Sequence, residues 1–124
     1  MVEYRNIVSH EWHRRHTLRL YSQGVVTRAE ICECDFLLRT AAEFHGSPSS
    51  RDCPVCSSQN MRDVLWIYGD EVGRAAGSAR SEEEIAQLVS AGKLFDVHRV
   101  EVCPDCHWNH LLATMVVSPR TRYA

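Results

Sequence analysis

Two copies of a Cys-Pro-x-Cys motif, at residues 53–56 and 103–106, constrain this chain more than any other feature. The two-residue spacing turns the backbone so that both sulfurs of a motif can reach one ion, at about 2.3 Å for zinc. Proline at the second position fixes φ in that turn. Two such pairs supply four thiolates, a set that selects zinc or iron over magnesium or calcium. The sequence therefore predicts one structural Zn²⁺ per chain, with no coordination position open for catalysis, held by Cys53, Cys56, Cys103 and Cys106.

Other uses of these cysteines stay open at this point. A single Cys-x-x-Cys pair is typical of dithiol redox proteins, and six cysteines allow several disulfides. A redox pair is expected once, within a βαβ pattern, whereas this chain repeats the motif with the same proline. Iron is the nearest competitor for the metal. Rubredoxin-type iron sites resemble this spacing but usually carry glycine after the second cysteine, where this chain has Ser57 and His107, and this difference favours zinc.

Length and charge bound the class of protein. A chain of 124 residues forms one compact domain, or a small metal module with a helical appendage. The net charge of −2 provides no global field that recruits nucleic acid, although residues 1–28 are basic and residues 82–84 form an acidic run. The first residues lack the pattern of a signal peptide, and no run approaches the roughly 18 apolar residues of a membrane span. We expect a cytoplasmic protein without a membrane partner, in a compartment that keeps thiols reduced.

Apolar spacing and capping signals predict about three helices in residues 1–46. Periodic apolar residues predict a first helix over residues 3–21. Thr27 followed by Glu30 has the form of a capping box and starts a short second helix. Asp35 is expected to cap a third helix over residues 36–45.

The remaining residues predict an expanded zinc ribbon. The segment 47–52 is rich in turn-forming residues and is expected to be a linker to the module at 53–124. Ser81 with Glu84 forms another capping box, which starts an inserted helix near residues 81–91. β-branched and aromatic residues predict strands of a small antiparallel sheet over residues 64–68, 95–102 and 111–117. The predicted fold class is α+β: an N-terminal helical segment, a linker and a zinc-ribbon-like module.

Histidines suggest a second metal site only weakly. His10, His13 and His16 lie at three-residue steps on one sector of the predicted first helix. Metalloprotease helices need His-Glu-x-x-His, with the two histidines four residues apart. A solvated or partly packed helix face is the favoured interpretation. His107 and His110 follow the second motif and are expected to support the cysteines rather than replace one.

Three further residues, one beside the second motif and two at the predicted second helix, have other expected roles. Trp108 is expected to pack beside the metal or against the helices. Cys32 and Cys34 are expected to be small buried hydrophobes. The alternative for either cysteine is a redox-sensing thiol with a pKa lowered by Arg28.

Five segments together resemble a family of small actinobacterial proteins of unknown function. They are residues 41–46 (AAEFHG), 53–56 (CPVC), 68–70 (YGD), 100–103 (VEVC) and 108–111 (WNHL). The resemblance runs over nearly the whole chain. It implies zinc, cytoplasm and a bacterial origin, and it brings no established activity.

The expected function is that of a non-enzymatic zinc-binding adaptor. Zinc ribbons recur in transcription and translation machinery, so by analogy the partner is expected to be a protein or ribonucleoprotein such as RNA polymerase or the ribosome. Two alternatives stay open. One is a DNA-binding regulator with a helix-turn-helix at residues 27–45 and Arg39 on the recognition helix. The other is a thiol redox sensor.

Overall fold

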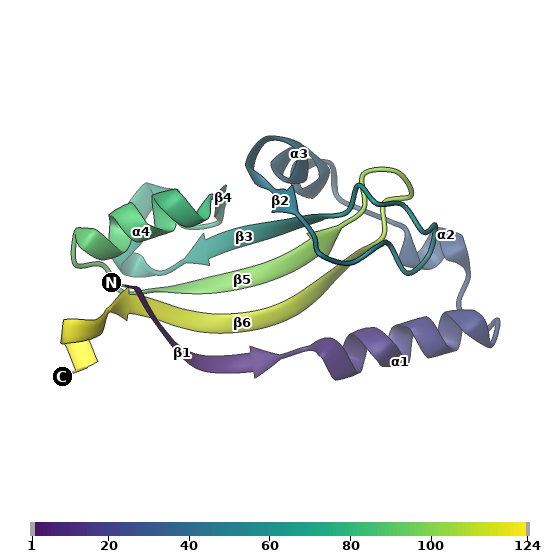
Figure 1. Ribbon diagram of the computed structural model, residues 1–124, viewed down its shortest axis with the longest axis horizontal. Coiled ribbons are helices and arrows are strands. Elements are labelled where there is room, and N and C mark those ends of the chain that lie inside the picture. The colour runs from purple at the N-terminus through teal and green to yellow at the C-terminus, as the bar shows by residue number, and fades with distance from the viewer. Residues whose placement is uncertain (1, 124) are drawn as a thin grey trace.

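One antiparallel sheet of six strands runs through the computed structural model, which describes residues 2–123 (Figure 1). The strands are β1 (Val2–Ser9), β2 (Ser47–Pro48), β3 (Arg62–Tyr68), β4 (Ser78–Arg80), β5 (Phe95–Val102) and β6 (Asn109–Pro119). Their order in the sheet is β1-β6-β5-β3-β2, and β4 also pairs with β3. The combination of helices with an antiparallel sheet agrees with the predicted α+β class.

Helices pack on both faces of this sheet. The α-helices are α1 (Glu11–Ser22), α2 (Arg28–Ile31), α3 (Phe36–His45) and α4 (Glu82–Ser90), and the short 3-10 helices are η1 (Asp70–Ala75) and η2 (Arg120–Tyr123). Because successive strand residues point to opposite faces, Val64 and Ile67 of β3 face different helices. Val64 packs in a core cluster with Ala42 of α3, whereas Ile67 packs in another with Ile85 of α4.

Both predicted capping boxes are present. The Thr27 and Ser81 hydroxyls accept from the backbone N–H groups of Glu30 and Glu84, and each glutamate side chain accepts in return from the N–H of its cap residue. The predicted side-chain cap at Asp35 is wrong, since Asp35 makes no capping hydrogen bond, although α3 has the predicted bounds. The predicted strands are confirmed as parts of β3, β5 and β6.

The predicted helix over residues 3–21 is wrong in its first half. Residues 2–9 form β1, which pairs antiparallel with β6, and α1 begins only at Glu11. The pairing shifts register between Arg5 and Val8, and Asn6 has a φ of 52° there. Tyr4 is three and four residues from Ile7 and Val8, which is the spacing of one helix face. The irregular pairing accommodates that spacing in a strand, and pairing with β6 outweighs the apparent helical period.

The N-terminal residues and the predicted linker both take part in the sheet. Through β1 the first segment adds an edge strand beside β6. Ser47 and Pro48 of the predicted linker pair with Asp63 and Arg62 of β3 as the short strand β2. Within residues 2–123, no helix has both the length and the apolar character needed to cross a membrane.

Candidate metal centre

The four predicted ligands come together at one end of the sheet. Their Sγ atoms all lie within 4.8 Å of one another. The distances from Cys53 to Cys106 and from Cys56 to Cys103 are both 3.6 Å. A tetrahedron of sulfurs at 2.3 Å from zinc has edges of about 3.8 Å, whereas a disulfide needs an S–S distance of about 2.05 Å. The cluster fits a tetrahedral metal ion, and all six cysteines are free thiols.

The two motifs form matching turns, here called the first and second cysteine turns (residues 53–58 and 103–108). In each, the fifth residue donates its N–H to the carbonyl of the first cysteine, and the N–H of that cysteine donates to the carbonyl of the sixth residue. The bonds are Ser57 to Cys53 at 3.0 Å and Cys53 to Ser58 at 2.8 Å, then His107 to Cys103 at 2.9 Å and Cys103 to Trp108 at 2.7 Å. Because the two turns share this geometry, both pairs of sulfurs face the metal site in the same way.

Backbone N–H groups and burial act on these sulfurs in opposite directions. The N–H of Val55 lies 3.4 Å from Cys53 Sγ, and that of Trp108 lies 3.4 Å from Cys106 Sγ. Burial nevertheless raises the pKa of the Cys53 and Cys106 thiols. Burial also acts to raise the pKa of Cys56, but the Ser58 backbone and neighbouring thiols outweigh it, so that the pKa is lowered. A bound divalent cation would supply the positive charge that favours all four thiolates.

Neighbouring strands, hydrogen bonds and a buried cluster fix the position of the two turns. Cys103 follows β5 directly, and β6 begins right after the second turn. Asp105 of that turn accepts from the Asn60 amide at 3.2 Å and from the Ser58 hydroxyl, and these bonds join the two turns. Trp108 packs with Cys53, Cys103 and Met61 in a buried cluster, as predicted for a residue beside the site.

A buried carboxylate network ties α1 to both turns. Glu101, two residues before Cys103, is fully buried. Arg14 of α1 donates to it from Nε, and from Nη2 at 3.3 Å, while Arg51 donates from Nη2 at 3.2 Å. Arg51 lies two residues before Cys53 and also binds Glu11 at 3.1 Å. Sequence reasoning missed this network, because nothing in the strand pattern distinguishes Glu101 from a solvent-facing residue.

The histidines are not gathered into a second site. Within residues 2–123, the four cysteines are the only group of His, Cys, Asp and Glu side chains close enough to share an ion. His13 packs edge-on against His110 with ring centroids 5.1 Å apart, and His16 stacks on Trp12 at 6.0 Å. Burial lowers the pKa of His110. These contacts agree with a partly packed helix face.

The other two cysteines occupy different environments. Cys34 packs in the cluster beneath α3, and burial raises its pKa. Cys32 instead belongs to the cluster around the metal ligands, with its Sγ 3.7 Å from Cys106 Sγ. The sequence held no signal for this approach, since 73 residues lie between the two cysteines.

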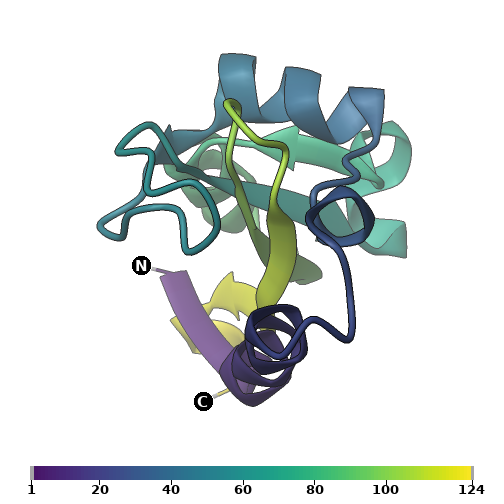
Figure 2. The same ribbon diagram turned by 90° about the vertical axis from the view of Figure 1, so that its right-hand side faces the viewer.

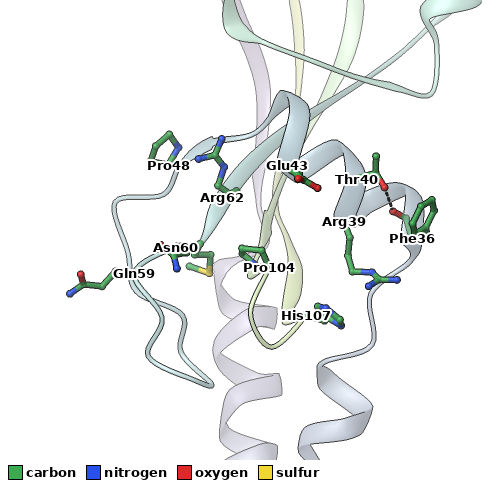
Figure 3. Close-up of a pocket in the computed structure, with 11 residues that line it drawn as sticks. Phe36, Arg39, Thr40, Glu43, Pro48, Gln59, Asn60, Arg62, Pro104 and His107 are labelled. Atoms are coloured by element: carbon green, nitrogen blue, oxygen red, sulfur yellow. Dashed lines mark hydrogen bonds between the residues drawn. The ribbon is translucent and has the colours of Figure 1, made fainter.

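A cavity of about 760 Å³ adjoins the cysteine turns (Figure 3). Side chains from α3, from β2, from the start of β3 and the segment before it, and from the second cysteine turn line it: Phe36, Arg39, Thr40, Glu43, Pro48, Gln59, Asn60, Met61, Arg62, Pro104 and His107. Arg62 donates to the Gly46 carbonyl at 2.6 Å. Arg39 lies over the Phe36 ring at 5.8 Å, and no described residue accepts a hydrogen bond from its Nε.

Comparisons with known proteins place the chain among bacterial relatives. Uncharacterized proteins of Mycobacterium tuberculosis and Mycobacterium bovis are each 39% identical to it over 104 residues, which cover 84% of this chain and 76% of each relative. No solved structure matches the chain significantly. The model of DUF5318, a family of unknown function, matches residues 1–123, and the chain therefore belongs to this family.

Proposed function

We propose that this protein holds one structural zinc ion through Cys53, Cys56, Cys103 and Cys106 and serves as a non-enzymatic adaptor for a macromolecular partner. The observation that carries the proposal is the closed cluster of four thiols, whose spacing suits a tetrahedral ion. Four protein ligands are typical of structural zinc, whereas catalytic zinc keeps one position for water or substrate.

We propose zinc rather than iron because of the residue that follows the second cysteine of each turn. Ser57 and His107 stand where rubredoxin-type turns usually carry glycine. Free thiols at all six cysteines suit the reducing cytoplasm, which is where we place the protein. The N–H donors to Cys53 and Cys106 support thiolates around either metal, so metal analysis must decide between them.

The surface beside the metal centre supports a role in binding. On α3, Phe36, Leu37 and Phe44 are 67%, 66% and 72% exposed. Phe36 lines the cavity beside the cysteine turns, whereas Leu37 and Phe44 line a second hollow with Trp66. Exposed large apolar side chains at such hollows are a feature of interaction sites. Arg39 also lines the cavity beside the cysteine turns, where its guanidinium can donate to a carbonyl or carboxylate of a partner.

Protein or ribonucleoprotein binding has more support than DNA binding. The helix-turn-helix alternative would use α3 as recognition helix, but α2 has only four residues. The exposed residues of α3 are three large apolar side chains with Glu43 and His45, and its one arginine, Arg39, is half-buried. Duplex readout favours a basic surface. By analogy with zinc ribbons of transcription and translation machinery, RNA polymerase and the ribosome are the first partners to test.

Native and denaturing mass spectrometry of protein purified without chelator tests the metal. We expect one zinc per chain. Cys103→Ser should lose the ion and melt far below the parent protein, because structural zinc contributes on the order of 10 kcal/mol to folding. Cys34→Ser is the matched control and should keep the zinc ion and the melting temperature of the parent protein. Bound iron, or mass losses of two hydrogens per cysteine pair without metal, would contradict the zinc assignment.

Binding to purified mycobacterial ribosomes and RNA polymerase tests the adaptor role. We expect one of them to bind the zinc-loaded protein, and expect Phe36→Ala with Phe44→Ala to weaken binding at least ~10-fold. The control is Gln87→Ala, an exposed position on α4, which packs on the other face of the sheet. Zinc content and melting of all variants should match the parent. Binding to neither assembly, or equal loss with Gln87→Ala, would refute this role.

A further inference from the structure

A fifth thiol lies against the metal centre. Cys32 Sγ is 3.7 Å from Cys106 Sγ, nearly the same as the 3.6 Å between Cys53 and Cys106 within the cluster. Cys32 is not among the four sulfurs that are all within 4.8 Å of one another. It therefore sits outside the tetrahedral set, next to one of its corners.

Contacts from three elements hold Cys32 in this place. The Asn109 side chain donates to the Glu33 carbonyl at 2.7 Å and to the His107 carbonyl at 3.0 Å, which fixes the chain beside Cys32 to the second cysteine turn. The N–H of Cys32 donates to the Arg28 carbonyl at 2.9 Å and closes α2. Leu18 of α1 packs in the same cluster. The close approach of the two sulfurs is thus built into the fold.

Exposure distinguishes these two sulfurs from the deepest ligands. Cys32, Cys56 and Cys106 are half-buried, whereas Cys53 and Cys103 are buried. Of the half-buried ligands, Cys106 is the one with its Sγ in contact with Cys32 Sγ. A small oxidant in solvent therefore has access to Cys32 and Cys106. A cysteine held as a thiolate by a metal is already in the nucleophilic form.

We propose that Cys106 and Cys32 form a reversible disulfide under hydroperoxide stress and that this releases the metal ion. The proposal rests on the four-cysteine metal site. The Cys106 thiolate sulfur attacks the O–O bond of the hydroperoxide, which breaks as an S–O bond forms, and water or an alcohol leaves after taking up a proton. The Cys32 sulfur then attacks the sulfenic sulfur; the S–S bond forms, the S–O bond breaks, and the thiol proton leaves with the hydroxide as water.

The consequence for the metal follows from the count of ligands. The disulfide consumes one of four thiolates, and the peroxide is reduced by the two electrons that the sulfurs lose. Three cysteines remain for the ion, so its affinity falls. A thiol reductant reverses the disulfide and restores the full ligand set. Cys34 has no part in this chemistry, since it packs in the cluster beneath α3 and not in the cluster around the metal ligands.

Stoichiometric hydrogen peroxide on the metal-loaded protein provides the test. A chromogenic chelator follows release of the ion, and non-reducing peptide mass mapping identifies the disulfide. We expect a Cys32–Cys106 link, metal release, and recovery with reductant and added zinc. Cys32→Ser should bind one zinc as the parent does and release it at least ~10-fold more slowly. Cys34→Ser, the matched control, should release it at the parent rate.

The outcomes separate this proposal from the proposed function. Equal release from Cys32→Ser and the parent protein, or a map in which the disulfides join only the four ligands, overturns the switch and leaves structural zinc standing. Absence of metal before peroxide is added refutes the metal site itself. If Cys32→Ser fails to fold, the disulfide map of the parent protein still decides between a Cys32–Cys106 link and other pairings.

Discussion

Within residues 2–123, two of the three non-glycine residues with a positive φ lie in the two cysteine turns. Ser57 has a φ of 64° and His107 a φ of 73°, in the left-handed region. A non-glycine residue there costs roughly 1–2 kcal/mol. The matching turn hydrogen bonds hold both residues in this conformation, because each donates its N–H back to the first cysteine of its turn.

Ser57→Gly should therefore stabilise the metal-loaded protein. Glycine removes the left-handed penalty but loses more chain entropy on folding, so the net gain should be about 0.5–1 kcal/mol. Ser57 is exposed, and its hydroxyl makes no hydrogen bond described within residues 2–123, so little else changes. Thermal melting at fixed zinc concentration is the measurement. The control Ser57→Ala keeps the penalty and should show no gain; equal melting of both variants would show that strain at this position is negligible.

The sequence predicted which four cysteines gather, but not what surrounds them. Repeated short-range spacing shows that each pair can form a turn, and the shared chemistry indicates that the pairs meet. Cys32 and Glu101 carry no such local signal. Their roles arise from long-range approach, of α2 to the second cysteine turn in one case and of α1 to the end of β5 in the other.

Among whole elements, the sequence predicted best where local signals and packing agree. α4 has a capping box and an apolar face over one side of the sheet, and it was predicted within a few residues. β1 was mispredicted for two reasons. Its apolar residues have helical spacing, which the irregular pairing with β6 accommodates, and its partner strand lies more than 100 residues away along the chain. Local patterns cannot report such a partner.

Loss of the α4 cap should be measurable against a control in the same helix. Ser81→Ala removes the hydroxyl that accepts from the Glu84 N–H, and we expect a loss of about 1 kcal/mol in the free energy of unfolding at neutral pH. Ser90→Ala changes an exposed serine at the end of α4 and should have little effect. Denaturant unfolding of the zinc-loaded proteins measures both. A similar loss in the two variants would argue against the cap.

The same capping box predicts a pH dependence. The backbone N–H of Ser81 and then Arg80 hold the pKa of Glu84 below its ordinary value of 4.5. Because the pKa is lowered in the folded state, the Glu84 carboxylate contributes its full stabilisation above pH 4.5, and this contribution is lost as the pH falls from 4.5 through the lowered pKa. The difference in stability between the parent protein and Glu84→Gln should therefore shrink as the pH drops through 4.5. Both proteins carry the same thiols, so metal loss at acid pH cancels in this difference.

Across the whole molecule, each core cluster joins residues from the segment 1–46 to residues from 47–124. Ala42 of α3 packs with Val64 and Val102, and Leu18 of α1 packs around the metal ligands. At one end of the sheet, α1, α2 and the loops that carry the cysteines lie together (Figure 2). The buried charge of Glu101 is balanced by Arg14 from α1.

These connections predict that the fragment 47–124 does not fold on its own, even with zinc. Without residues 1–46, β6 loses its pairing with β1, the apolar face beneath α3 is exposed, and Glu101 loses Arg14 and keeps only Arg51 as a charged partner. A buried charge left with no partner costs about 3–5 kcal/mol, a large share of the stability of a small domain. Because Arg51 remains, the loss of Arg14 adds less than this to the cost of the lost strand pairing and the exposed apolar face. Far-ultraviolet circular dichroism and thermal melting of the zinc-supplemented fragment should show no cooperative transition. A fragment that binds one zinc and melts cooperatively would instead establish residues 47–124 as an autonomous module, with residues 1–46 an addition to it.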